Sequence, residues 1–190
     1  MIKAITFDFW QTLYADSSEL NRKRQAMRTE RCHKFLMERG YNCTLTEVDA
    51  GFQAAYNFVT ERWHQHRGVT EAEWILIFFK TFRLNLAQPD LDYFVKVVGE
   101  VVLDTPPVLL PHAKEVLAEL STKYRLGVIS DTGLTPGRVL RQLMERSQIL
   151  QYFTVQTFSD ETTHTKPEAL QFHSTLRRLN VQPAEAVHIG

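Results

Sequence analysis

The sequence predicts an α/β protein in which a doubly wound parallel sheet is interrupted by an all-helical insertion. Two observations lead to this fold class. Residues 2–9 and the chain after Pro111 contain short apolar strands, and the later ones alternate with helix-length segments. That alternation is typical of a parallel sheet covered by helices on both faces. From about Ser17 to Thr105 no segment has convincing strand character.

The segment without strands instead shows apolar residues spaced three or four apart, which is the period of a helix. We therefore expect a core domain from residues 1–14 and 106–190 and an inserted helical domain from residues 15–105. The four helices expected in the insertion run from about Ser18 to Glu38, from Thr44 or Thr46 to before Gly68, from about Thr70 to Leu86, and over the apolar positions Leu91 to Val102.

After the insertion, the sequence predicts three helices that alternate with three strands. The strands are short, and a segment of helix length lies between successive strands. The expected order is a helix over 111–124, a strand over 125–130, a helix over 135–145, a strand over 152–158, a helix over 166–179 and a strand over 186–190. Together with the strand at residues 2–9 they make one sheet, and ligands of such sheets bind at the carboxyl ends of the strands.

Composition narrows the class of partner. Lysine plus arginine and aspartate plus glutamate each number 22, so net charge gives no argument for binding nucleic acid or a membrane. The N-terminus has no signal-peptide pattern, and no apolar run approaches the roughly 20 residues that span a bilayer. Cys32 and Cys43 form no metal or disulfide pattern. We expect a cytoplasmic protein acting on a small molecule, with no nucleic-acid or membrane partner; its oligomeric state stays open.

Polar residues follow three of the expected strands. Asp8 ends the first strand, Ser130 and Asp131 end the strand over 125–130, and Lys166 lies in the loop after the next strand. Parallel strands bring such positions to one edge of the sheet. A carboxylate there can act as a nucleophile, and an ammonium group and a hydroxyl can bind an anionic substrate.

Taken singly, each of these residues has an ordinary structural interpretation. Asp8 is compatible with a helix N-cap or a salt bridge, Ser130 and Asp131 with the cap of a following helix, and Lys166 with a surface position. The functional signal lies in the ordered set, with each member at a strand end.

The ordered set resembles the motifs of the haloacid dehalogenase superfamily of hydrolases. Asp8 and Thr12 in "FDFWQTLY" match the first motif, Ser130 after an apolar strand matches the second, and Lys166 with Pro167 matches the third. The final "EAVHIG" matches the start of the fourth. The resemblance covers the whole chain and implies a Rossmann-like core with an inserted helical cap domain. It also implies Asp8 as the nucleophile and Thr12, Ser130 and Lys166 as further catalytic residues.

The resemblance further implies a substrate and a cofactor. A small phosphorylated metabolite is the expected substrate, contacted by Trp10 and Asp131. Mg²⁺ would be held by Asp8, by the main-chain carbonyl of Trp10 and by family aspartates whose place would follow Gly190. The sequence ends at Gly190, so either it is a fragment or it departs from the family there.

Trp10 is a departure from the family's phosphatases. They carry at this position an aspartate that protonates the leaving group, and indole cannot transfer that proton. The family's dehalogenases have an aromatic residue there and release halide without protonation. A metal-independent 2-haloacid dehalogenase, with a cap arginine such as Arg28, Arg31 or Arg39 receiving the halide, is therefore one alternative. A non-catalytic binding or regulatory protein of the same fold is another.

Overall fold

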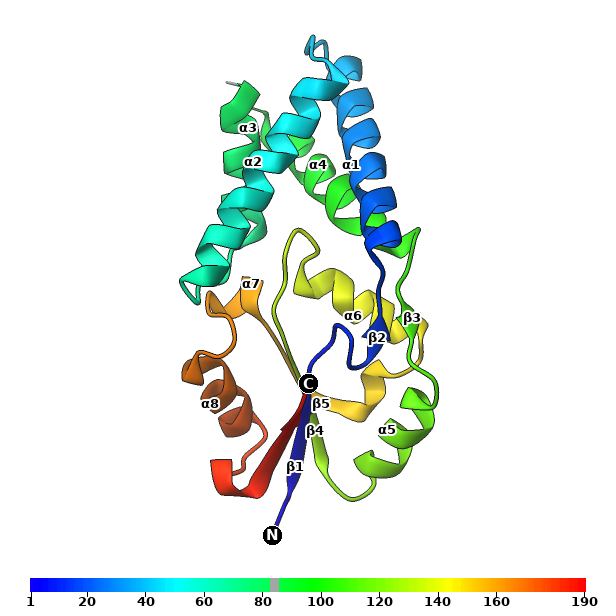
Figure 1. Cartoon of the computed structure of the whole chain (residues 1–190), viewed down its shortest axis with the longest axis vertical. Helices are drawn as coiled ribbons and strands as arrows, with labels where there is room; N and C mark the ends of the chain where they lie inside the picture. The colour runs from blue at the N-terminus through cyan, green and yellow to red at the C-terminus, as the bar shows by residue number, and fades with distance from the viewer. Residues whose placement is uncertain (83–85) are drawn as a thin grey trace.

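The computed structural model describes residues 1–82 and 86–190, and its centre is a four-stranded sheet (Figure 1). The strand order is β5-β4-β1-β6, and every neighbouring pair is parallel. The strands are β1 (Ala4–Phe7), β4 (Arg125–Ser130), β5 (Phe153–Phe158) and β6 (Ala186–Ile189). The prediction of a parallel α/β sheet is confirmed, and its carboxyl edge faces the inserted helices (Figure 1).

Helices cover both faces of this sheet, as the alternation of strands and helices predicts. α5 (Ala113–Ser121) and α6 (Gly137–Arg146) lie on one side of it and α8 (Ala169–Arg178) on the other (Figure 1). Leu117 of α5 and Leu140 of α6 pack with Val128 of β4 in the larger core. A smaller cluster on the side of α8 contains Val155 and Leu179.

The described part of the inserted segment is mainly helical. It contains α1 (Ser18–Glu38), α2 (Leu45–His64), α3 (Glu71–Phe82), α4 (Gln88–Gly99) and the 3₁₀ turn η1 (Glu100–Leu103). α1 has the predicted bounds, and the hydroxyl of Ser17 accepts a hydrogen bond from Leu20 N at its start. An aromatic cluster of buried residues joins α2, α3 and α4. The expected continuation of the third helix to Leu86 crosses residues 83–85, which lie outside the described residues.

Several boundaries differ from the prediction. β1 is shorter than residues 2–9, whereas α2 ends at His64, before Gly68 as expected. The helix expected over 166–179 begins only at Ala169, because a residue before proline, here Lys166, disfavours the helical conformation. Three short turns have no counterpart in the prediction: α7 (Ser159–Thr162), η2 (Leu150–Tyr152) and η3 (Pro183–Glu185).

The two connections between the sheet and the inserted helices pair with each other. β2 (Tyr14–Ala15) and β3 (Val108–Leu109) form an antiparallel ladder, with Tyr14 opposite Leu109 and Ala15 opposite Val108. This ladder was not predicted, because two residues are too few to show a strand pattern. The expected domain junctions near residues 15 and 105 lie close to it, and the division into core and cap stays a prediction.

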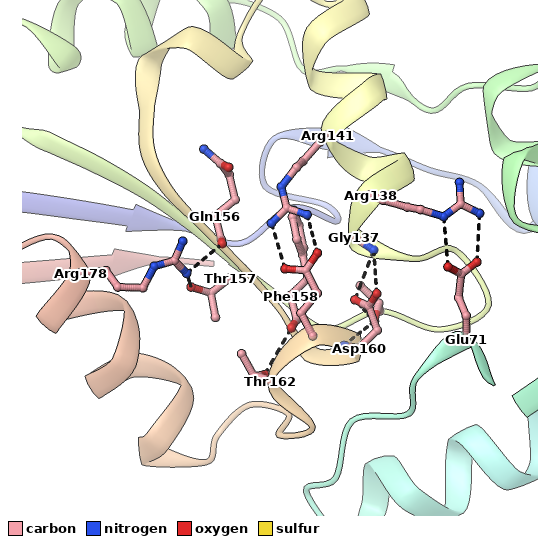
Figure 2. Close-up of polar contacts among 12 residues, drawn as sticks. Glu71, Gly137, Arg138, Arg141, Gln156, Thr157, Phe158, Asp160, Thr162 and Arg178 are labelled. Atoms are coloured by element: carbon pink, nitrogen blue, oxygen red, sulfur yellow. Dashed lines mark hydrogen bonds and ion pairs between the residues drawn. The ribbon is translucent and has the colours of Figure 1, made fainter. Parts of the chain in front are cut away.

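Figure 2 shows how α6 is tied to its neighbours. Arg138 of α6 forms ion pairs with Glu71 of α3 at 3.0 Å and with Glu100 of η1 at 3.2 Å. At the start of α6, Pro136 provides no side-chain cap, and the Asp160 carboxylate accepts hydrogen bonds from Gly137 N at 3.2 and 3.1 Å instead. A residue distant in sequence thus serves as the N-cap of this helix.

We expect Asp160→Ala to lower the free energy of unfolding by about 1–2 kcal/mol, because a buried helix start loses its acceptor. Glu161→Ala is the matched control: its ion pair with Arg141 is partly exposed, and such pairs contribute about 0–1 kcal/mol. Urea unfolding monitored by circular dichroism measures both. Equal losses in the two variants would contradict the capping role.

Candidate active site

Asp8 lies directly beyond the end of β1, in a tight loop. Its backbone N–H donates to Ile189 O of β6 at 2.9 Å, and its carboxylate Oδ1 accepts from Phe9 N at 2.7 Å. Leu13 N and Tyr14 N both donate to Phe9 O at 3.0 Å, which closes the loop. The carboxylate is thereby fixed at the edge of the sheet, with its side chain 23% exposed.

Lys166 meets Asp8 directly. Its Nζ lies 2.6 Å from Asp8 Oδ2, and its side chain is 19% exposed. Charge-assisted hydrogen bonds of this length are among the stronger polar contacts in proteins. Both oxygens of the Asp8 carboxylate therefore have partners, one an ammonium group and the other a backbone amide.

Asp131 positions the loop that carries Lys166. Its Oδ1 accepts from the backbone N–H of Lys166 at 2.9 Å, and its Oδ2 accepts from Trp63 Nε1 at 3.1 Å. Trp63 is on α2, so this aspartate links the inserted helices to the candidate site. The sequence analysis did not single out Trp63, and nothing in the local pattern around it points to this contact.

Ser130, Thr12 and Trp10 lie around this pair without touching it through any hydrogen bond within the described residues. Ser130 ends β4, is fully buried, and donates its hydroxyl to Asp131 O at 3.2 Å. Thr12 and Trp10 are half-buried in the loop after Asp8. The Trp10 ring packs edge-on against Phe9, with 4.8 Å between the ring centroids.

Gly190 passes closely over Asp8. A Cβ atom built at Gly190 would lie 2.6 Å from Asp8 Cβ, a distance that side chains do not adopt. A glycine is therefore needed where the end of β6 approaches the carboxylate. This steric requirement explains why the apolar strand "AVHI" is followed by glycine.

Comparison with known proteins identifies the family of this chain. A family model described as haloacid dehalogenase-like hydrolase matches residues 2–190. The chain belongs to this hydrolase family. This match confirms the family that the motifs at Asp8, Ser130 and Lys166 indicated. A search of curated protein sequences finds no match to this hydrolase.

Solved structures of the family share the fold. A 2-haloacid dehalogenase from Pseudomonas syringae pv. Tomato DC3000 is 21% identical with a TM-score of 0.68, over 99% of this chain and 77% of that one. A HAD phosphatase from Thermococcus onnurineus is 24% identical with a TM-score of 0.56, over 100% and 77%. The L-2-haloacid dehalogenase of Xanthobacter autotrophicus with chloropropionic acid covalently bound is 18% identical with a TM-score of 0.52, over 99% and 69%.

The residues described in this hydrolase do not by themselves form a magnesium site. Mg²⁺ requires near-octahedral oxygen ligands and gives up water reluctantly. Asp8 and the carbonyl of Trp10 are the ligands that the sequence analysis expects, and both Asp8 oxygens already have partners. Within residues 1–82 and 86–190, no group of three or more His, Cys, Asp or Glu side chains is placed to hold a metal ion. In the same residues, no helix is long and apolar enough to cross a membrane.

The pKa of His188, on β6, depends on the charges of Lys166 and Asp8. Its Nδ1 lies 3.0 Å from Thr6 Oγ1, and its pKa is lowered first by burial and then by the positive charge of Lys166, while Asp8 raises it. Since the unfolded chain binds this proton more readily, the contribution of His188 to stability falls as the pH drops below about 6.5.

We expect Lys166→Met to raise the pKa of His188, because a nearby positive charge is removed. Asp8→Asn should lower it further, because the compensating negative charge is lost. The Cε1 proton resonance of His188, followed by NMR through a pH titration in metal-free buffer, measures both. Shifts of the same sign in the two variants would contradict the arrangement of charges at this site.

Proposed function

We propose that this protein is a hydrolase that uses Asp8 as its nucleophile and acts on a small phosphorylated metabolite. The observation that carries the proposal is the 2.6 Å contact between Lys166 Nζ and Asp8 Oδ2 at the carboxyl edge of the sheet. A lysine in this place supplies positive charge to an incoming phosphoryl group. Family membership supports the choice of hydrolysis.

The proposed reaction has two steps. In the first, an Asp8 carboxylate oxygen forms a bond to phosphorus, and the ester P–O bond breaks with its electron pair leaving on the alcohol oxygen. In the second, water attacks phosphorus, the P–O bond to Asp8 breaks with its electron pair returning to the carboxylate, and inorganic phosphate leaves; the proton that the water loses balances the one that the released alkoxide takes up from solvent. In this scheme Lys166 balances charge, and the hydroxyls of Ser130 and Thr12 are the candidate donors to the phosphoryl oxygens.

Asp131 and Trp10 take less direct parts in the proposed site. The contacts of Asp131 with Lys166 N and Trp63 Nε1 make it a positioning residue for the lysine loop. Trp10 forms part of the wall beside the nucleophile. The helices α1–α4 serve as a cap over this edge in the proposal, and the substrate is a small molecule reached from between them. The cytoplasmic location expected from the sequence stays a prediction.

A metal-independent 2-haloacid dehalogenase is the second candidate. Trp10 favours it, because indole cannot protonate an alcohol leaving group and halide needs no proton. In that reaction an Asp8 oxygen displaces halide from carbon, and water then hydrolyses the resulting ester. The similar L-2-haloacid dehalogenase of Xanthobacter autotrophicus, with chloropropionic acid covalently bound, supports this candidate. A non-catalytic member of the fold is the remaining alternative.

One panel of substrates distinguishes the phosphatase, the dehalogenase and the non-catalytic protein. The purified chain is incubated with aryl and alkyl phosphates and with 2-chloropropionate, each with and without Mg²⁺, and released phosphate and chloride are measured. The proposal expects phosphate release that is lost in Asp8→Asn. Chloride release without phosphate release would establish the dehalogenase instead, and the absence of both products across the panel would favour the non-catalytic alternative.

A further inference from the structure

A cavity of about 280 Å³ lies between the inserted helices and the loops beside Asp8. α1 and α2 form one side of it. Trp10 and Gln11, from the loop that follows Asp8, form another, and the segment from Gly133 to Thr135, shortly after Asp131, forms a third. The cavity therefore adjoins both loops of the candidate active site.

Arg28 of α1 lines this cavity and is unusually deeply buried for an arginine, with 4% of it exposed. Its guanidinium donates to Tyr56 Oη at 3.0 Å, to Thr135 Oγ1 at 3.1 Å and to Val98 O at 3.3 Å. These three acceptors are uncharged. Among the residues that the structure describes, Arg28 forms no salt bridge with a carboxylate, although buried cations in proteins are usually paired.

The other charged residues of the cavity compensate each other. Arg24 lies 2.7 Å from Asp16 and also donates to Thr105 O, so its charge is balanced. Arg28 thus leaves the cavity lining with one net positive charge. Burial lowers the pKa of Arg28 most, Tyr56 raises it, and the nearby Arg24 lowers it further.

We propose that this cavity binds a carboxylate on the far end of the substrate, with Arg28 as its partner. The inference rests on the proposed function, and it defines the substrate as a small phosphorylated organic acid. An anionic group would supply the missing countercharge, and a guanidinium can bind a carboxylate with two parallel hydrogen bonds. In this arrangement Trp10 lies between the carboxylate subsite and Asp8. Both the carboxylate end and the phosphate end of the substrate contact it.

The test compares two ligands that differ in one charge: 3-phosphonopropionate and its amide, 3-phosphonopropionamide. Calorimetric titration of the wild-type chain, with and without Mg²⁺, should give at least about tenfold tighter binding of the carboxylate, because a buried charge pair is involved. Arg28→Gln should abolish this preference, and Arg28→Lys should reduce it, since lysine cannot form the paired contact. Arg31→Gln is the matched control: Arg31 is on the same helix but partly exposed and paired with Asp104, so its loss should leave the preference unchanged.

A measurement on the wild-type chain keeps the test decisive if the Arg28 variants fail to fold. The Nε–H resonance of Arg28 should shift on adding the carboxylate ligand and not on adding the amide. Equal binding of the two ligands, or a preference that survives Arg28→Gln, would overturn the inference. Hydrolysis of phenyl phosphate is measured in parallel: a carboxylate preference without any hydrolysis would refute the proposed function and leave the anion site standing.

Discussion

Replacing Asp8 by asparagine is expected to reduce turnover by about a thousandfold or more, as removal of a nucleophile does in other hydrolases. The amide oxygen is a poor nucleophile, yet the change is nearly isosteric. An asparagine Oδ1 can still accept the hydrogen bond from Phe9 N that holds the loop. The measurement is phosphate release from an aryl phosphate, after circular dichroism has shown that the variant is folded.

Asp160→Asn serves as the control for this experiment. Asp160 is also a half-buried carboxylate, but it caps α6 and forms no hydrogen bond or ion pair with Asp8 or Lys166 among the described residues. Its loss of charge should leave turnover within a few-fold of the wild type. Full activity in folded Asp8→Asn protein would remove Asp8 from the mechanism.

The second large effect expected is a strong preference for activated substrates. An alkyl phosphate releases a basic alkoxide, whereas an aryl phosphate releases a stable phenolate that needs no proton. Positioned acid catalysis contributes typically ~10²–10⁴-fold, and Trp10 cannot supply it. We therefore expect phenyl phosphate to be hydrolysed faster than a matched alkyl phosphate by a factor of this order.

Variants at position 10 test whether the tryptophan causes this preference. Trp10→Asp should narrow the ratio between aryl and alkyl turnover, because a carboxyl group can protonate the leaving oxygen. Trp10→Phe removes the indole without adding an acid, so it should leave the ratio wide. A comparable, rapid turnover of both esters by the wild type would show that another residue supplies the proton.

Much of this architecture could be predicted because it depends on local sequence. The bounds of α1 follow from Ser17 as its N-cap, and those of β4 from an uninterrupted apolar run. The meeting of Asp8 with Lys166 could be expected because parallel strands place their carboxyl ends at one edge.

Other features depend on packing between distant segments, and no local pattern reveals them. The ladder between Tyr14–Ala15 and Val108–Leu109 joins residues more than ninety positions apart. The contacts of Asp131 with Trp63 and the backbone of Lys166 are of this kind, and its expected contact with the substrate stays a prediction. The burial of Arg28 on α1 without a carboxylate partner among the described residues also becomes apparent only in three dimensions.

The covalent intermediate on Asp8 provides the most direct test of the account. The chain is mixed with excess aryl phosphate, quenched during turnover, and treated with borohydride, which reduces an activated carboxyl group to an alcohol. Mass spectrometry of the digested protein should then find homoserine at position 8, and Asp131 and Asp160 should be unchanged. Continued turnover with aspartate intact at position 8, or with the reduced residue elsewhere, would contradict the claim that Asp8 is the nucleophile.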